Sequence, residues 1–271
     1  MSSVVIFRAR QVMVAMCLMA AFSCNASASP KTITVQSGRP VAEAVEELER
    51  RYDWQITYED PPYVHYSDIV DVTDFGRPRA PVPSQSQLES MRNNRTLVPK
   101  GGSLTFTLPS ADPDEMAAVE ALLKSYNESH QGFEFAVVQG EGMLHIVPRQ
   151  ARGLSGNLEP VKPILDTVIT IEPKERTSWE LLKEVFKKVS IATNTRVEFG
   201  TVSYNMLFRS KTAIGGSGKT ARSILEQWIG GALSWELLNE PDTKVYLFNI
   251  TQVSPPKNII WLPRPSPAGK P

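Results

Sequence analysis

The chain has 271 residues, a length that suits two domains of ordinary size, and 41% of its residues are hydrophobic, enough for a core in each. Its 29 basic and 29 acidic side chains cancel to a formal net charge of zero. This balance excludes the strongly basic surface with which nucleic-acid-binding proteins displace counterions from phosphates, so we expect no nucleic-acid partner.

The first residues have the order of a secretory signal peptide. Two arginines precede an apolar run at 12–22, and small residues follow, with Ala28 as the cleavage position. The run is too short to cross a bilayer. We therefore predict a leader at 1–28 and a protein that is exported to the periplasm or secreted. Two alternatives stay open: a buried N-terminal helix, and lipidation at Cys24, in which case alone we expect membrane contact.

Both cysteines, Cys17 and Cys24, lie within the predicted leader. Cleavage after Ala28 would leave a mature chain without thiols, which excludes disulfides, thiolate nucleophiles and cysteine-ligated metals. We therefore expect the exported protein to depend on its hydrophobic cores for stability.

Strand and helix patterns alternate from residue 32 to residue 147. Apolar residues in alternate positions predict strands, and an apolar stripe at helical spacing predicts an amphipathic helix. A proline-rich stretch at 61–101 interrupts this order, and a loop of such length within a compact domain is either functional or mobile. Within it, 68–72 has the pattern of a short extra strand. The other expected elements are strands at 32–36, 54–59 and 104–108, a helix at 40–52, a helix beginning near Asp112, and a hairpin at 133–147.

The second half of the chain has a similar order. A polar stretch at 148–163 contains prolines and glycines, and we predict a linker at 151–163. Trp179, Trp228 and Trp235 lie on apolar stripes and are expected in the core. From 254 to 271 the chain is rich in proline, and we expect it to be extended or disordered. The expected elements are strands at 168–171, 197–199, 206–214, 233–237 and 245–250, a helix beginning at Thr177 or Ser178, and a helix at 220–229.

Both halves therefore have the order β-α-β-β-α-β-β. We predict an α+β fold of two such modules in tandem, each with two helices packed on small mixed sheets. The first module covers 29–150 and includes the 61–101 insertion, and the second covers 164–253. Residue identity between the halves is low, so the prediction concerns a structural repeat and not a duplication.

Two pairs of segments carry a resemblance to a known domain family. They are RRYDWQITYED at 50–60 with FEFAVVQGEGMLHIV at 133–147, and ARSILEQW at 221–228 with the strands at 233–238 and 244–250. Their order is similar to the secretin and TonB N-terminal short domain, called STN. The resemblance implies a βαββαββ core and a periplasmic adaptor that makes protein–protein contacts. It is nearest to small exported proteins that carry such modules alone.

The segment GGSGKT at 215–220 precedes a predicted helix and looks like a phosphate-binding loop. The complete pattern requires a glycine where this chain has Ala213, so we expect no nucleotide. We interpret the segment as a flexible loop that ends in a helix cap at Thr220.

The three histidines, His65, His130 and His145, lack the spacing of metal ligands, and His145 is interpreted as a structural residue on a strand. No nucleophile motif is present, and no pair of carboxylates stands out. We therefore expect no metal and no cofactor, and we name no catalytic residue.

The most unusual local cluster is formed by Tyr58, Glu59, Asp60 and Tyr63, where two tyrosines flank two acids and a diproline at the end of a predicted strand. One interpretation is a contact surface for a protein partner or a glycan, and these four residues are our candidate binding site. The other interpretation is a stiff strand exit whose tyrosines pack on the edge of the module.

We predict a non-enzymatic cell-envelope protein whose partner is another envelope protein. Modules of this kind present sheet edges, which suit the addition of a partner strand. Two alternatives stay open: a hydrolase that acts on envelope substrates in a pocket between the modules, and a glycan or small-molecule binder at the 58–63 cluster.

Overall fold

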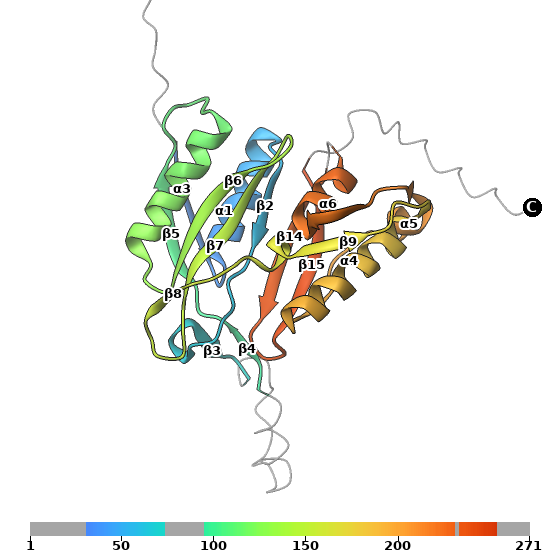
Figure 1. Cartoon of the computed structure of the whole chain (residues 1–271). Coiled ribbons are helices and arrows are strands. Elements are labelled where there is room, and N and C mark those ends of the chain that lie inside the picture. The colour runs from blue at the N-terminus through green and yellow to red at the C-terminus, as the bar shows by residue number, and fades with distance from the viewer. Residues whose placement is uncertain (1–30, 74–94, 231–232, 254–271) are drawn as a thin grey trace, which may run out of the picture.

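The computed structural model of this chain describes residues 31–73, 95–230 and 233–253 (Figure 1). The predicted leader with its cleavage position at Ala28, Cys24 and the proline-rich tail lie outside the described residues. The described residues form helices and mixed sheets, and the predicted α+β class is confirmed. None of the helices in this part of the chain combines the length and the apolar composition that a membrane crossing requires.

The first half places two small groups of strands around helices α1 (Pro40–Tyr52) and α3 (Glu115–Ser129). Pro40 occupies the first turn of α1, where its missing N–H removes no helical hydrogen bond. β1 pairs antiparallel with β5, whereas β2 lies parallel to β7, which forms a hairpin with β6. The strands are β1 (Thr32–Ser37), β2 (Ile56–Glu59), β5 (Gly102–Thr107), β6 (Phe133–Gln139) and β7 (Leu144–Arg152).

The second half has the same pairings around helices α4 (Ser178–Thr193) and α6 (Ala221–Ile229). β9 pairs antiparallel with β13, whereas β11 lies parallel to β15, which forms a hairpin with β14. Thr177 and Glu180 form a capping box at the start of α4. The strands are β9 (Val168–Ile171), β10 (Arg176–Thr177), β11 (Arg196–Phe199), β12 (Lys211–Thr212), β13 (Gly216–Thr220), β14 (Leu233–Glu240) and β15 (Val245–Gln252).

The two first helices also end alike. The C-cap residues, Asp53 after α1 and Asn194 after α4, both have a left-handed backbone, with φ of 57° and 51°. This conformation turns the chain sharply into the strand that follows each helix. That the halves are two copies of one module stays a prediction.

One sheet joins the two halves. β14 lies parallel to β2, with Glu236 opposite Tyr58 and Leu237 opposite Glu59, and the N–H of Asp60 donates to the carbonyl of Leu237 at 2.8 Å. The order of this seven-stranded sheet is β11-β15-β14-β2-β7-β6, with β8 (Leu158–Pro160) paired to β7 outside the row. The expectation that each module has its own small sheets is therefore wrong at this junction. Pairing satisfies backbone groups that an isolated edge strand would leave open.

The halves pack on opposite faces of the shared sheet. Successive residues of β2 point to opposite sides: Ile56 and Tyr58 enter the core of the first half, whereas Glu59 faces α6 and bonds Arg222. Figure 1 shows α4 and α6 in front of the sheet and α1 behind it. The face of β2 that points away from the core of the first half is therefore covered by α6, and the face of β14 that points away from the core of the second half is covered by α1.

The insertion at 61–101 adds a pair of short strands. The 3-10 turn η1 (Tyr66–Asp68) leads into β3 (Ile69–Asp71), which pairs antiparallel with β4 (Leu97–Pro99). The expected short strand at 68–72 is thus confirmed. The rest of the insertion, 74–94, lies outside the described residues.

The expected strand at 206–214 is wrong. Helix α5 (Tyr204–Arg209) occupies the first part of this segment, and β12 follows it. Leu207 is the buried residue of α5 and belongs to the core of the second half. A short apolar run fits one face of a helical turn as well as a strand, so the run alone does not distinguish them.

The stretches predicted as a linker and as a flexible loop are more ordered than expected. β7 continues to Arg152, and β8 pairs back onto it. Pro148 is tolerated inside β7 because it lies at a β-bulge, where the register with β6 shifts. Residues 216–220 form β13, and Thr220 caps α6, as predicted, by accepting a hydrogen bond from the N–H of Ser223.

Candidate functional site

The four candidate binding residues lie together at the junction between the halves. Tyr58, Glu59 and Asp60 are buried, with at most 2% of each exposed, and Tyr63 is half-buried. The carboxylate of Asp60 accepts hydrogen bonds from the hydroxyl of Tyr58 at 2.7 Å and from that of Tyr63 at 3.1 Å. The structure therefore gathers both tyrosines around one acid.

Arg39 links Asp60 to the second half. Its Nε donates to Asp60 at 2.7 Å, and its Nη2 donates to the carbonyl of Asn239 at 2.7 Å and to Glu240 at 3.0 Å. The N–H of Asn239 donates to the same carboxylate at 2.9 Å. Burial raises the pKa of Asp60, and the attraction of Arg39 and these donors opposes the rise. Charge-assisted bonds of this kind fix a buried carboxylate in one position.

Glu59 forms a second link, on the other side of β2. Its carboxylate accepts from Arg222 Nη2 at 2.6 Å and from the N–H of Ile164, while Arg222 Nε donates to Asp166 at 2.9 Å. Glu59 and Arg222 are both buried. Burial raises the pKa of Glu59, and the charge of Arg222 acts against that rise. Removal of Arg222 would leave Glu59 as an uncompensated buried charge.

A row of three polar side chains crosses the same side of the junction. Thr57 Oγ1 lies 2.6 Å from His145 Nδ1, and His145 Nε2 lies 2.6 Å from Glu226 Oε1. Burial, together with the charge of Arg222, lowers the pKa of His145 to about 3. The ring is therefore neutral, and its partners assign the tautomer: Thr57 donates to Nδ1, and Nε2–H donates to Glu226.

This row has the residue types of a hydrolytic triad but not its accessibility. A triad presents its hydroxyl to the substrate, whereas Thr57 and His145 have no exposed surface. The row therefore holds β2, β7 and α6 together, which agrees with the interpretation of His145 as a structural residue.

A groove of about 1070 Å³ opens beside these links, between the two halves. Asp60 and Tyr63 lie on its first-half wall, and Arg196 and Lys244 lie on its second-half wall. Glu59 also lines it, but Glu59 and Asp60 are already bonded to arginines. These two carboxylates therefore offer no free acid–base pair to a substrate.

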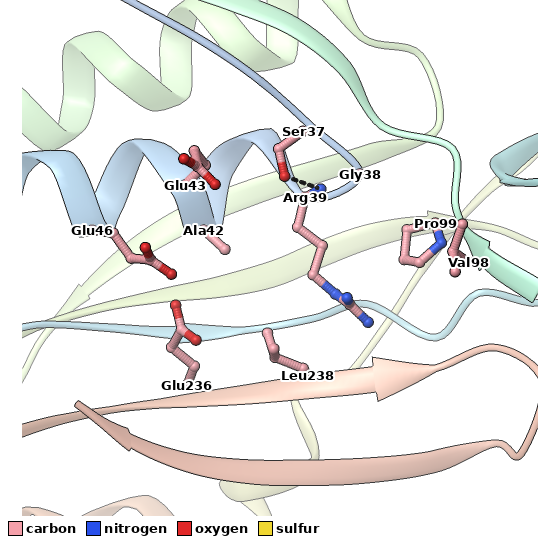
Figure 2. Close-up of a pocket in the computed structure, with 10 residues that line it drawn as sticks. All are labelled: Ser37, Gly38, Arg39, Ala42, Glu43, Glu46, Val98, Pro99, Glu236 and Leu238. Atoms are coloured by element: carbon pink, nitrogen blue, oxygen red, sulfur yellow. Dashed lines mark hydrogen bonds between the residues drawn. The ribbon is translucent and has the colours of Figure 1, made fainter. Parts of the chain in front are cut away.

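A smaller cavity of about 320 Å³ lies between α1 and the other face of β14. Figure 2 shows Glu46 of α1 and Glu236 of β14 pointing toward each other, with Arg39 further along the cavity. Burial raises the pKa of Glu236 to about 7, and the charges of Glu46 and Glu49 add to the rise. Burial also raises the pKa of Glu49 to about 7. In the described part of the chain, no three His, Cys, Asp or Glu side chains are arranged to hold a metal ion.

A partly exposed group of aromatic rings lies beside β11, which is the last strand at one end of the sheet in the described part of the chain. Trp179 of α4 stacks on Phe199 of β11, with 4.1 Å between ring centres, and contacts Phe208 and Tyr204 of α5 at 5.2 Å and 5.6 Å. Phe208 is 52% exposed and Tyr204 is 50% exposed. We call these four residues the aromatic surface. Exposed apolar groups that cluster in this way mark contact sites.

No protein-family model, curated protein or solved structure matches this chain. The resemblance to STN domains rests on the order of helices and strands in each half, and it stays a prediction. The same holds for the binding role of Tyr58, Glu59, Asp60 and Tyr63.

Sequence reasoning missed the two arginines that hold the junction and the aromatic surface. One signal was available for Arg222, which stands in the first turn of a helix, where a cation opposes the helix dipole. An arginine at such a position therefore indicates an acidic partner in the fold that offsets its unfavourable interaction with the helix dipole. Arg39 precedes Pro40 in a turn and gave no comparable signal.

Proposed function

We propose that this protein is a non-enzymatic cell-envelope adaptor that binds an extended segment of another envelope protein at the open edge of β11. The observation that carries the proposal is the position of the aromatic surface directly beside that edge. The predicted signal peptide supports the envelope location. The STN-like order of elements in both halves supports the adaptor role.

The backbone of β11 offers hydrogen-bonding groups to an added strand. In a parallel pair, alternate residues direct their N–H and C=O to opposite sides. The N–H of Gly200 donates to Phe248 of β15 at 3.0 Å, so Phe199 directs its own groups away from β15. Ser190 Oγ already accepts from the N–H of Val197 on that side. An added strand therefore finds its pairing groups around Phe199.

The aromatic surface offers contacts to the side chains of such a strand. Strand addition derives affinity from main-chain hydrogen bonds and specificity from pockets for alternate side chains. Phe199 lies on the strand itself, and Tyr204 and Phe208 lie beside it on α5. Aromatic rings bury much apolar area against a partner. We therefore infer a partner segment with apolar side chains at alternate positions.

A photo-crosslinking residue at position 208 tests this proposal in intact envelopes. We expect a covalent product with a protein whose linked peptide is extended and has alternate apolar residues, as identified by mass spectrometry. The same residue at position 66 is the control, because Tyr66 is 80% exposed and lies outside the aromatic surface. Identical products from positions 208 and 66 would contradict the proposal.

The groove between the halves favours a second candidate, the binding of a glycan or another small molecule. Its volume of about 1070 Å³ suits a small ligand, and two of the candidate residues, Asp60 and Tyr63, line it. Calorimetry with soluble glycan fragments would measure such binding. A heat of binding that the wild type shows and Tyr63→Ala does not would support this candidate, and equal heats of binding from the two proteins would count against it. The third alternative, a hydrolase, has no such observation in its favour among the described residues.

A further inference from the structure

The junction inside the chain shows how two of its strand edges recognise each other. β14 is the first strand of the hairpin that closes the second half, and it pairs in parallel with β2, the strand that follows the first helix of the first half. Leu238, beside the paired residues, packs half-buried against the core of the first half. Backbone pairing and one apolar side chain thus act together.

β11 has the same place in the second half that β2 has in the first. Each strand follows a helix with a left-handed C-cap and lies parallel to the last strand of its hairpin. In each strand, the backbone N–H of the first buried residue donates to a side chain of the preceding helix, seven positions earlier. The N–H of Ile56 donates to Glu49 at 3.3 Å, and the N–H of Val197 donates to Ser190 at 3.0 Å. β6 and β14 correspond as well, because each opens the closing hairpin of its half.

The two ends of the seven-stranded sheet are therefore a second pair of complementary edges. In the described chain, β6 has no strand beyond it at one end, and β11 has none at the other. On β6 the side chain of Asn127 already bonds the N–H and C=O of Phe135, so an added strand pairs nearer to Val137. β6 is the counterpart of β14, and β11 is the counterpart of β2. The parallel strand pairing that joins the halves within one chain can therefore also join one end of the sheet in one molecule to the opposite end of the sheet in another.

Exposed side chains at both ends suit this contact. Val137 pairs with Ile146 as Leu237 pairs with Phe248, so Val138 is the counterpart of Leu238. Val138 is 41% exposed, whereas Leu238 is half-buried against the other half. At the β11 end, the aromatic surface supplies an apolar area that could cover this valine.

The ion pairs of the internal junction have no counterpart at the ends. Alignment of Ile56 with Val197 places Gly200 at the position of Glu59, so no carboxylate is available there for an arginine of the next copy. The contact between copies therefore depends on backbone pairing and apolar burial. We expect it to be weaker than the internal junction and reversible.

We propose that copies of this protein associate head to tail, with β6 of one copy added in parallel to β11 of the next. This inference rests on one part of the proposed function, the addition of a strand at the open edge of β11, and it names a second copy of the chain in place of a different protein as the source of that strand. The two contacting edges differ, so each dimer keeps one free β6 and one free β11. A contact of this type continues into longer chains unless its rotation closes a ring.

Two substitutions at exposed positions block the two edges separately. Val138→Lys places a charge on β6, a device by which natural edge strands avoid unwanted addition, and Phe208→Lys places one beside β11. Sedimentation velocity of the purified protein at rising concentration measures the association. We expect the average mass of the wild type to rise above that of the monomer, and each variant alone to stay monomeric.

An equal mixture of the two variants gives the decisive result. β6 of the Phe208→Lys protein and β11 of the Val138→Lys protein remain free, so the mixture should form dimers of twice the monomer mass and nothing larger. Val168→Lys on β9, at a valine that is 58% exposed, and Tyr66→Lys are matched controls that should associate like the wild type. Circular dichroism checks that each variant is folded.

The outcomes separate this inference from the proposed function. A monomeric wild type at every concentration, a mixture of variants that stays monomeric, or a Val138→Lys protein that still associates would each overturn the head-to-tail contact. If position 208 nevertheless crosslinks to a different protein, the adaptor proposal stands and a foreign strand is the occupant of β11. If position 208 crosslinks only to a second copy of the chain, the head-to-tail contact is supported and the foreign partner is not.

Discussion

Replacement of Glu236 by Gln is expected to stabilise the protein at neutral and alkaline pH and to leave its stability unchanged in acid. Glu236 is buried on β14, facing Glu46 of α1 (Figure 2). Burial, and then the charges of Glu46, Glu49 and Asp60, raise its pKa from 4.5 to about 7, although a hydrogen bond from Asn249 opposes the rise. Glutamine keeps the size and the hydrogen-bonding oxygen of the side chain and removes its charge.

The sign of the effect follows from the linkage between proton binding and folding. The pKa of Glu236 is higher in the folded than in the unfolded protein, so the folded state holds the proton more tightly. The stability that this gives is fully present below about pH 4.5 and is lost as the pH rises through 7. At about 1.4 kcal/mol for each pKa unit, the loss in the wild type is about 3 kcal/mol above pH 7. E236Q has no such proton to lose.

Urea unfolding followed by tryptophan fluorescence, at steps between acid and alkaline pH, measures the free energy of unfolding of both proteins. Titrating groups that do not interact with Glu236 act equally in both proteins, so their contributions cancel in the difference. Glu120→Gln, at an exposed position of α3, is the control and should stay within about 0.5 kcal/mol of the wild type throughout. An advantage of E236Q that is the same at every pH would refute the reasoning, because it would report packing and not a raised pKa.

Three further predictions concern the junction and one helix end. Arg222→Met should destabilise the protein by about 3–5 kcal/mol in urea unfolding, because Glu59 then remains as a buried unpaired charge. Addition of Glu59→Met to this variant should restore most of the lost stability. A further loss of stability in the double variant would count against this account. His145 has a pKa lowered to about 3 by burial and by Arg222, so its contribution is present above pH 6.5 and is lost as the pH falls through 3. His145→Asn should therefore unfold with less pH dependence below 6.5, and an unchanged slope would contradict the lowered pKa. Asn194→Gly should raise the free energy of unfolding by up to about 1 kcal/mol, because its φ of 51° suits glycine, and a lower melting temperature would disagree with this.

Elements with a local pattern could be predicted from the sequence, and the pairing between the halves could not. α1 and β2 are visible in residues 40–59 as a helical stripe followed by alternation, both of which are local properties. The contact of β2 with β14 is different, because it places charged residues such as Glu59 and Glu236 at positions that look solvent-facing in each strand. Their burial depends on helices of the other half, which no local pattern records.

The candidate site was predicted in part. Tyr58, Glu59, Asp60 and Tyr63 were chosen for their unusual composition, and the structure brings them to one junction. Two acids at a strand end suggested an exposed contact surface, whereas their arginine partners stand 21 and 163 positions away in the chain. The aromatic surface was missed because the segment of Phe208 was expected to be a strand, and because an apolar stripe does not show that Trp179, which packs against the core as expected, is only half-buried.

The junction also determines the order in which this protein can fold. The N–H of Asn239 and the carboxylate of Asp60 are 179 positions apart, so the first half is synthesised well before β14 exists. During that interval the edge of β2 is open and Glu59 lacks its arginine. A neighbouring chain whose β14 is already complete can occupy the edge and produce a domain-swapped pair. We therefore expect the swapped fraction to rise with the concentration of chains that fold together.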